Sequence, residues 1–216
     1  MNDWSIVVAG DATASERYAA EEFQSLFRQL TGVALPITGE VPARSKNIFI
    51  GAGAAAAAGP SGFDADGMGE ESLRIRVLGE NVVVAGGRPR GTLYGVYEFF
   101  ERYCGVRFLT ADQTYFPAVS QVPPLGEVDF SYTPPFSFRW SYYKENSDRP
   151  EFAARMRINT VTQDEKLGGI IRQTLIGHSY ARWIIIEKYG AIYSEYFVFI
   201  DGERKCILFI FFMEPC

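Results

Sequence analysis

Residues 81–109 read NVVVAGGRPRGTLYGVYEFFERYCGVRFL and contain the signals of a strand, a turn and a helix in succession. The apolar run at residues 82–85 is rich in valine and predicts a buried strand, which a pair of glycines ends. Pro89 then stands where a helix can begin. From Leu93 onward, apolar and aromatic side chains recur every three or four residues, as on one face of a helix. The stretch therefore predicts a strand and a helix that packs against it, with a short strand following at residues 106–109.

The glycines of this stretch have two interpretations. Free N–H groups at the start of a helix can bind phosphate, but the stretch lacks both the dinucleotide-binding spacing and the Gly-Lys-Ser/Thr ending of a phosphate loop. Gly91 and Gly95 lie four residues apart on one helix face, where each glycine costs about 1 kcal/mol relative to alanine. We therefore expect these glycines to allow close packing of the helix against a sheet.

Similar patterns on the N-terminal side extend this unit into a domain. Helical spacing of apolar residues runs through residues 18–30, with Thr13 or Ser15 available as the N-cap and Gly32 as the end. The expected strands are at residues 4–9, 33–37, 47–51, 71–77 and 82–85, the last two as a hairpin. The predicted fold class is α/β, a sandwich of the α+β type in which two long helices cover a mixed sheet.

Acidic residues in the first of these helices suit its macrodipole. Glu16, Glu21 and Glu22 lie near the helix start, where a carboxylate is favourable, and Arg28 lies near its end, so their plain interpretation is a solvated face. We assign no chemistry to them.

Composition excludes several classes of function. The chain has 216 residues, of which 47% are hydrophobic and 15% aromatic, so it can bury a core. Its net charge of -5 and its scattered Lys and Arg residues predict no nucleic-acid partner, and no apolar stretch approaches the roughly 20 residues that cross a membrane. One histidine and three cysteines without metal-ligand spacing predict neither a metal site nor a cofactor.

Two passages carry a resemblance to a known family. They are SERYAAEEFQSLFRQLTGVALPI at residues 15–37 and GGRPRGTLYGVYEFFERYCGVRFL at residues 86–109. Both resemble the N-terminal domain that precedes the catalytic barrel in α-glucuronidases of glycoside hydrolase family 67, and they are closer still to domain-of-unknown-function family 4838. A related helix occurs ahead of the barrel in β-N-acetylhexosaminidases. The resemblance spans about residues 6–205 and implies polysaccharide breakdown with a carbohydrate partner.

The resemblance also implies a second part to the chain. Residues 112–132 read as an extended connector, and the Thr-Pro-Pro at residues 133–135 marks a boundary. In the families resembled, a segment such as FSFRWSY at residues 136–142 is the first strand of a (β/α)8 barrel. We therefore expect an N-terminal α/β domain at residues 1–130 and the incomplete first strands of a barrel at residues 131–216.

Such a barrel typically takes about 250 residues, so it cannot close within residues 131–216. Glycoside hydrolysis needs two carboxyl groups around one sugar, and in barrels of the resembled kind these come from later strands. We therefore assign no catalytic residue and expect no turnover from this chain alone, although the resemblance implies a glycoside hydrolase for a longer parent. Glu145 and Asp148 are read as ordinary solvated acids. The N-terminus shows no signal segment, and the compartment is left open because proteins of the resembled kind are often secreted.

Four residues are candidate sugar contacts. Arg139 matches an arginine that related barrels place on the first strand to bind sugar hydroxyls, while Trp140 can stack on a sugar or pack in a core. Residues 150–159 (PEFAARMRIN) are expected as a helix leading to a strand and match the family pattern PEWAARNRLN, which makes Asn159 either a substrate contact or a turn residue. His178 matches a family GHSF segment and is read as substrate-facing or structural.

A different class of function fits the same residues. A non-catalytic carbohydrate-binding module could use Arg139 and Trp140 without chemistry, and exposed aromatic residues also suit a protein-interaction module. The apolar residues 206–213 would suit a strand that awaits neighbours or an aberrant end of a truncated reading frame, and we favour the latter.

Overall fold

The structure, a computed structural model, describes residues 4–42, 46–172, 185–200 and 202–205. The chain divides into two compact units, Met1–Ile171 and Arg172–Cys216. Each is described by itself.

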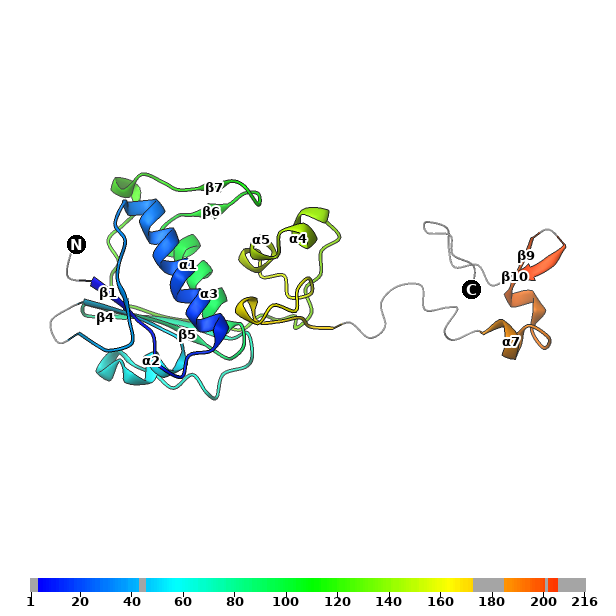
Figure 1. Cartoon of the computed structure of the whole chain (residues 1–216), viewed down its shortest axis with the longest axis horizontal. Helices are drawn as coiled ribbons and strands as arrows, with labels where there is room; N and C mark the ends of the chain where they lie inside the picture. Colours follow the sequence, from blue (N-terminus) through cyan, green and yellow to red (C-terminus); the bar gives the residue numbers. More distant parts are fainter. Residues whose placement is uncertain (1–3, 43–45, 173–184, 201, 206–216) are drawn as a thin grey trace. The chain divides into compact units, whose positions relative to one another are not determined.

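A six-stranded mixed sheet forms the centre of the first unit (Figure 1). Its order is β2-β1-β3-β5-β4-β8, in which β2, β1, β3 and β5 run parallel and β4 is antiparallel to both its neighbours. The strands are β1 Trp4–Val7, β2 Ile37–Thr38, β3 Lys46–Ile50, β4 Leu73–Leu78, β5 Asn81–Gly86 and β8 Val128–Tyr132. The predicted mixed sheet and the hairpin of β4 and β5 are confirmed.

Helices cover both faces of this sheet (Figure 1). On one face, α1 (Ala14–Thr31) and α3 (Gly91–Tyr103) share a core with Ile6, Ile75 and Val84. On the other face, the short helix α2 (Ala52–Ala57) packs with a second set of strand side chains, among them Phe49 and Val83. The two predicted long helices are confirmed, and the alternation of strand side chains separates the two cores because successive residues point to opposite faces.

The ends of α1 follow from its sequence. Of the two possible caps, Thr13 is the one observed: its hydroxyl accepts the Glu16 N–H at 3.2 Å, and the Glu16 carboxylate accepts the Thr13 N–H at 2.8 Å. Gly32 ends the helix in the left-handed region, with φ of 78°.

Close packing of α3 on the sheet is also confirmed. A Cβ atom added at Gly91 would lie 2.2 Å from the carbonyl oxygen of Ser72, and one added at Gly95 would lie 2.9 Å from Cγ1 of Val84. Both contacts are closer than real side chains make, so glycine is what lets this helix approach the sheet.

Several expectations about strands differ from the structure. Of residues 33–37, expected as a strand, only Ile37 belongs to one, β2. Residues 128–132, expected as part of a connector, form the edge strand β8, in which Asp129 receives a bidentate ion pair from Arg74 of β4 at 2.8 and 2.7 Å. Residues 106–109, expected to follow α3 as a strand, contribute only β6 (Arg107–Phe108), which pairs with β7 (Thr114–Tyr115) in a separate ribbon. Residues 106–109 and 128–132 both contain strand-forming residues, but the strand that each forms depends on the neighbouring strand with which it pairs.

The chain after β8 is helical and irregular. It contains α4 (Lys144–Asp148), α5 (Pro150–Arg155) and a 3₁₀ turn η3 (Glu165–Leu167). The helix expected within residues 150–159 is confirmed, whereas residues 136–142 and 158–160 belong to no strand. Strand residues need a ladder partner, and the Arg139 N–H in this segment instead donates to the Asn159 side chain.

Glu16 and Glu22 are buried, which corrects the expected solvated face for these two residues, whereas Glu21 is exposed as expected. Besides capping α1, Glu16 accepts the Ala52 N–H at 2.8 Å and pairs with Arg88 at 3.2 Å. Burial raises the pKa of Glu16, but the two backbone N–H groups and Arg88 outweigh burial and hold the pKa below its ordinary value. Glu22 pairs with Arg155 of α5 at 3.0 and 3.1 Å.

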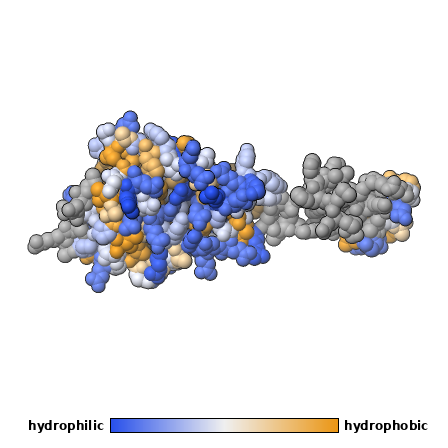
Figure 2. Space-filling view, turned by 45° about the horizontal axis from the view of Figure 1, so that its top comes forward, coloured by the Kyte–Doolittle hydropathy of each residue, from blue (hydrophilic) through white to orange (hydrophobic). Residues whose placement is uncertain are grey.

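The second unit is small in its described part. It contains α7 (Ile186–Tyr189), a 3₁₀ turn η4 (Ser194–Tyr196) and the antiparallel pair β9 (Val198–Ile200) and β10 (Glu203–Lys205). Across the described ranges of both units, none of the helices has the length and apolarity needed to cross a bilayer. In Figure 2 the first unit shows hydrophilic residues that surround separate hydrophobic patches.

Candidate functional site

Glu71, in the turn before β4, lies at the centre of a buried cluster of charged side chains and is only 7% exposed. Its Oε1 accepts hydrogen bonds from Nε of Arg90 at 2.8 Å and from Nδ2 of Asn159 at 2.7 Å. Its Oε2 lies 2.6 Å from Nη2 of Arg139. We call these four residues the Glu71 cluster.

The Glu71 cluster contains two cations and one anion, so its remaining donors need other acceptors. Carbonyl oxygens provide them: Arg90 donates to Gly168, and Arg139 donates to Arg157 at 2.7 Å and Phe136 at 2.5 Å. The guanidinium of Arg139 also lies over the ring of Tyr94, with 5.7 Å between Cζ and the ring centroid.

The hydroxyl of Tyr94 responds to the same surroundings. Burial and the negative charge of Glu71 raise the pKa of Tyr94 to about 12, although the two arginines act in the opposite direction. Tyr94 therefore stays neutral and contributes an aromatic wall to the cluster.

Two of the four predicted contact residues, Arg139 and Asn159, are thus brought together. Their backbones and side chains are joined: the Arg139 N–H donates to Oδ1 of Asn159 at 3.0 Å, and the Asn159 N–H donates to the Arg139 carbonyl at 3.4 Å. Nδ2 of Asn159 also donates to the Ser137 carbonyl at 2.8 Å. The polar atoms of both side chains point into the protein, where they hold residues 137–139 in place.

Trp140, the third predicted contact, has a different environment. It is 41% exposed, its ring centroid lies 4.1 Å from that of Tyr142, and Tyr142 is 82% exposed. On the other side its ring lies 6.4 Å from Phe138. Together with the exposed Phe136, these alternate residues form an aromatic strip, whereas Ser137 and Arg139 between them bond inward to the Glu71 cluster.

The fourth, His178, lies outside the described residues. In the part of the chain that the structure describes, no group of three or more His, Cys, Asp and Glu side chains could hold a metal ion. Cys104 is a core residue, and burial raises the pKa of its thiol to about 12.

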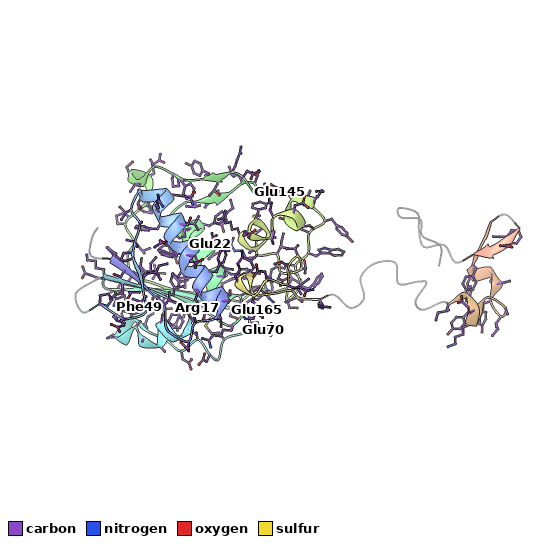
Figure 3. The ribbon with its side chains drawn as sticks, viewed as in Figure 1. Arg17, Glu22, Phe49, Glu70, Glu145 and Glu165 are labelled. Carbon is purple, nitrogen blue, oxygen red and sulfur yellow. The ribbon has the colours of Figure 1, made fainter. Side chains whose placement is uncertain are left out.

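The two acids that had been considered for catalysis are engaged in local contacts. Oε1 of Glu145 accepts the Ala111 N–H at 2.8 Å, which ties α4 to the loop between β6 and β7 (Figure 3). Asp148 pairs with Lys144 one helical turn away. Both belong to the surface, as expected for ordinary solvated acids.

The sequence interpretation missed Glu71 and Arg90. Glu71 is the first residue of the strand predicted at residues 71–77, and Arg90 lies at the start of the predicted helix, so both stand at the end of an element, where a charged residue is usually solvated. A shallow cavity of about 270 Å³ adjoins the cluster, and its walls include Glu70, Ser72, Thr133 and Ser137. The one signal in the sequence was the unusual density of arginine in the decisive stretch, where Arg88 and Arg90 flank a proline.

Comparison with known proteins finds a family model that is similar to the N-terminal part of the chain. Residues 2–99 match the model described as glycosyl hydrolase family 67 N-terminus. No curated protein matches the chain.

Solved structures with a similar arrangement are also found. A family GH115 4-O-methyl-α-glucuronidase with specificity for decorated arabinogalactans aligns over 72% of this chain and 24% of its own, with 14% identity and a TM-score of 0.46. A mutant Streptomyces plicatus β-hexosaminidase in complex with GlcNAc aligns over 72% and 29%, with 17% identity and a TM-score of 0.45. A GH138 enzyme targeting pectin rhamnogalacturonan II aligns over 73% and 18%, with 15% identity and a TM-score of 0.42. The chain thus spans less than a third of each of these proteins.

Proposed function

We propose, from the match of residues 2–99 to the glycosyl hydrolase family 67 N-terminus model, that the chain is the accessory domain and barrel opening of a glycoside hydrolase-like protein. The proposed role is polysaccharide breakdown of the α-glucuronidase kind. Residues 131–216 are then the start of the barrel, and the chain by itself does not hydrolyse glycosides.

The observation that carries the carbohydrate assignment is the aromatic strip. Trp140 and Tyr142 present adjacent rings at the surface of the first unit, and flat apolar rings with a polar edge suit the C–H faces and hydroxyls of a sugar. Ser137, Arg139 and Ser141, which alternate with the rings, are hydrogen-bonded to Asn159 and Asn146, so the rings are presented on a fixed backbone. We therefore assign sugar contact to Trp140 and a supporting role to Arg139 and Asn159.

The same strip supports the second candidate function, a non-catalytic carbohydrate-binding module. Both functions require sugar binding and differ only in whether hydrolysis occurs in a longer parent. Sugar binding and hydrolysis can therefore be measured in separate experiments.

Binding is tested with a glycan array and titration of the best ligand. We expect Trp140→Ala to weaken binding about tenfold or more, the usual effect of truncating a central aromatic contact. Tyr115→Ala, which removes a 50% exposed ring on β7, is the matched control and should leave affinity unchanged. Unchanged affinity in Trp140→Ala would remove the strip from the assignment.

Hydrolysis is tested separately on aryl glycosides and glucuronoxylan fragments. The expected result is no turnover. Activity that disappears on Glu145→Gln or Asp148→Asn would show that catalytic acids lie within this chain and would overturn the proposed accessory role.

A further inference from the structure

We infer that Glu71 is the positioning residue of the Trp140 sugar contact, so that the N-terminal sheet domain itself sets the shape of that contact. The inference rests on the proposed function, because it concerns the same aromatic strip. Glu71 does not touch the strip and acts through Arg139 and Asn159.

Glu71 reaches the residue before Trp140 by two routes. The first is direct, through the ion pair between Oε2 of Glu71 and the Arg139 side chain. The second is indirect: Oε1 of Glu71 holds the Asn159 amide group, and Oδ1 of Asn159 accepts the Arg139 backbone N–H. One carboxylate thus fixes both the side chain and the backbone of Arg139.

The other side of Trp140 is also held. The hydroxyl of Ser141 accepts hydrogen bonds from Nδ2 of Asn146 at 2.7 Å and from the Tyr143 N–H at 3.2 Å. These bonds fix the strip to α4, whereas the Glu71 bonds fix it to the sheet domain through the turn before β4. Trp140 therefore sits between a local anchor and an anchor from the N-terminal domain.

The charge balance identifies which group moves when Glu71 is neutralised. In Glu71→Gln, Arg90 and Arg139 face each other without the anion between them, and like charges in a poorly hydrated site repel. The Arg90 side chain is 4% exposed and is held by the Gly168 carbonyl, while the Arg139 side chain is 22% exposed. The Arg139 side chain is the more exposed of the two, so we expect it to move out of the cluster into solvent. The backbone before Trp140 then becomes more mobile.

Acrylamide quenching of Trp140 fluorescence, without any sugar, measures this loosening. A chain with Trp4→Phe and Trp183→Phe retains Trp140 as its sole tryptophan. In Glu71→Gln we expect the quenching constant to rise about twofold, since a side chain that is 41% exposed moves toward full exposure. Arg139→Gln should give a smaller but measurable rise, because the backbone of residue 139 keeps its link to Glu71 through Asn159. This variant leaves Glu71 paired with Arg90, so it keeps the test valid if Glu71→Gln does not fold.

Glu22→Gln is the matched control. It also neutralises a buried carboxylate paired with an arginine, Arg155 of α5, but it does not contact Arg139. Circular dichroism establishes that each variant is folded. A quenching constant unchanged in folded Arg139→Gln, or raised equally in Glu22→Gln, would overturn the positioning role.

Glycan titration of the same proteins completes the test. We expect Glu71→Gln to bind the best array ligand of the parent chain about tenfold more weakly, as loss of a positioned aromatic contact predicts. Raised quenching with unchanged affinity would refute the inference while leaving the proposed sugar binding intact. A parent chain that binds no glycan would instead refute the proposed function, whereas the quenching comparison would still measure how Glu71 holds Trp140.

Discussion

Substitution of Gly91 by alanine offers a direct test of the packing that organises the fold. In a helix, alanine is more favourable than glycine by at most about 1 kcal/mol, so on propensity alone Gly91→Ala should stabilise the chain. The structure predicts the opposite, because the new Cβ would lie 2.2 Å from the Ser72 carbonyl oxygen and 2.9 Å from the Gly86 carbonyl carbon. Both are backbone atoms that cannot turn aside.

The magnitude follows from what must move. Overpacking against a rigid neighbour costs about 1–3 kcal/mol. The Ser72 carbonyl also accepts the Gly87 N–H at 2.9 Å, and displacing it sacrifices a hydrogen bond worth about 1 kcal/mol. After the helix gain of about 1 kcal/mol is subtracted, a net loss of about 1–3 kcal/mol remains.

Urea unfolding followed by circular dichroism measures this loss. For a slope of about 2 kcal/mol/M, the midpoint should fall by roughly 0.5–1.5 M. Gly126→Ala, at a position with nothing within 4 Å of the added Cβ, should leave the midpoint nearly unchanged. Gly95→Ala should fall between the two, since its close neighbour is the Val84 side chain. A midpoint for Gly91→Ala equal to or above that of the parent would refute close packing as the reason for glycine.

Three other perturbations test buried groups. Arg155→Met leaves Glu22 as an uncompensated buried charge and should destabilise the chain by about 2–3 kcal/mol, measured by urea unfolding. This loss is smaller than that usual for a fully buried ion pair because Arg155 is partly exposed. The pKa of Glu16 in the folded chain lies below its ordinary value of 4.5, so its carboxylate stabilises the fold above that pH. This contribution is lost as the pH falls through the pKa of the folded chain. The loss of stability in Glu16→Gln should therefore be largest at pH 7 and smaller at pH 3. Burial raises the pKa of Cys104 to about 12, so in a variant whose two other cysteines are serine, iodoacetamide at pH 8 should label this thiol only after urea unfolds the chain.

The elements predicted well from sequence are those whose signals are local. The start of α1 is specified by Thr13 and Glu16, three residues apart, and its end by Gly32. The hairpin of β4 and β5 is specified by alternation around a glycine turn. In these cases the residues that decide the structure are neighbours, so a single sequence is enough to find them.

The elements that were missed depend on partners distant in sequence. Strand β8 exists because β4, more than 50 residues earlier, offers a free edge and an arginine for Asp129. Glu71 is separated from Asn159 by 88 positions, and Glu22 from Arg155 by 133. An isolated acidic residue next to a turn or in a first helical turn is usually solvated, and only tertiary contacts show that these are buried.

The sequence points to residues of the candidate site but not to their partners, for the same reason. Resemblance points to Arg139 and Asn159, and residue type points to Trp140. The structure brings Arg139 and Asn159 into contact, but it turns their polar groups inward. The sequence alone does not reveal Glu71, the carboxylate whose contacts turn these polar groups inward. A residue type can suggest sugar recognition, but whether its donors face a ligand or a buried anion is settled by a partner from another part of the chain.

Long-range ion pairs also explain how the residues after β8 remain joined to the sheet domain. Three partly buried arginines pair across this connection: Arg139 with Glu71, Arg155 with Glu22, and Arg157 with Glu98 and Glu101 of α3. Arginine suits this use because its planar fork reaches a carboxylate through two N–H groups while the flat guanidinium can also lie over an aromatic ring, as that of Arg155 does at Phe108. The acids sit on α1, α3 and the turn before β4, so elements around the hydrophobic core also hold the chain after β8. Among these four acids Glu71 is the one paired with Arg139, so the geometry of the aromatic strip depends on Glu71, whereas Glu22, Glu98 and Glu101 hold Arg155 and Arg157 at and after the end of α5.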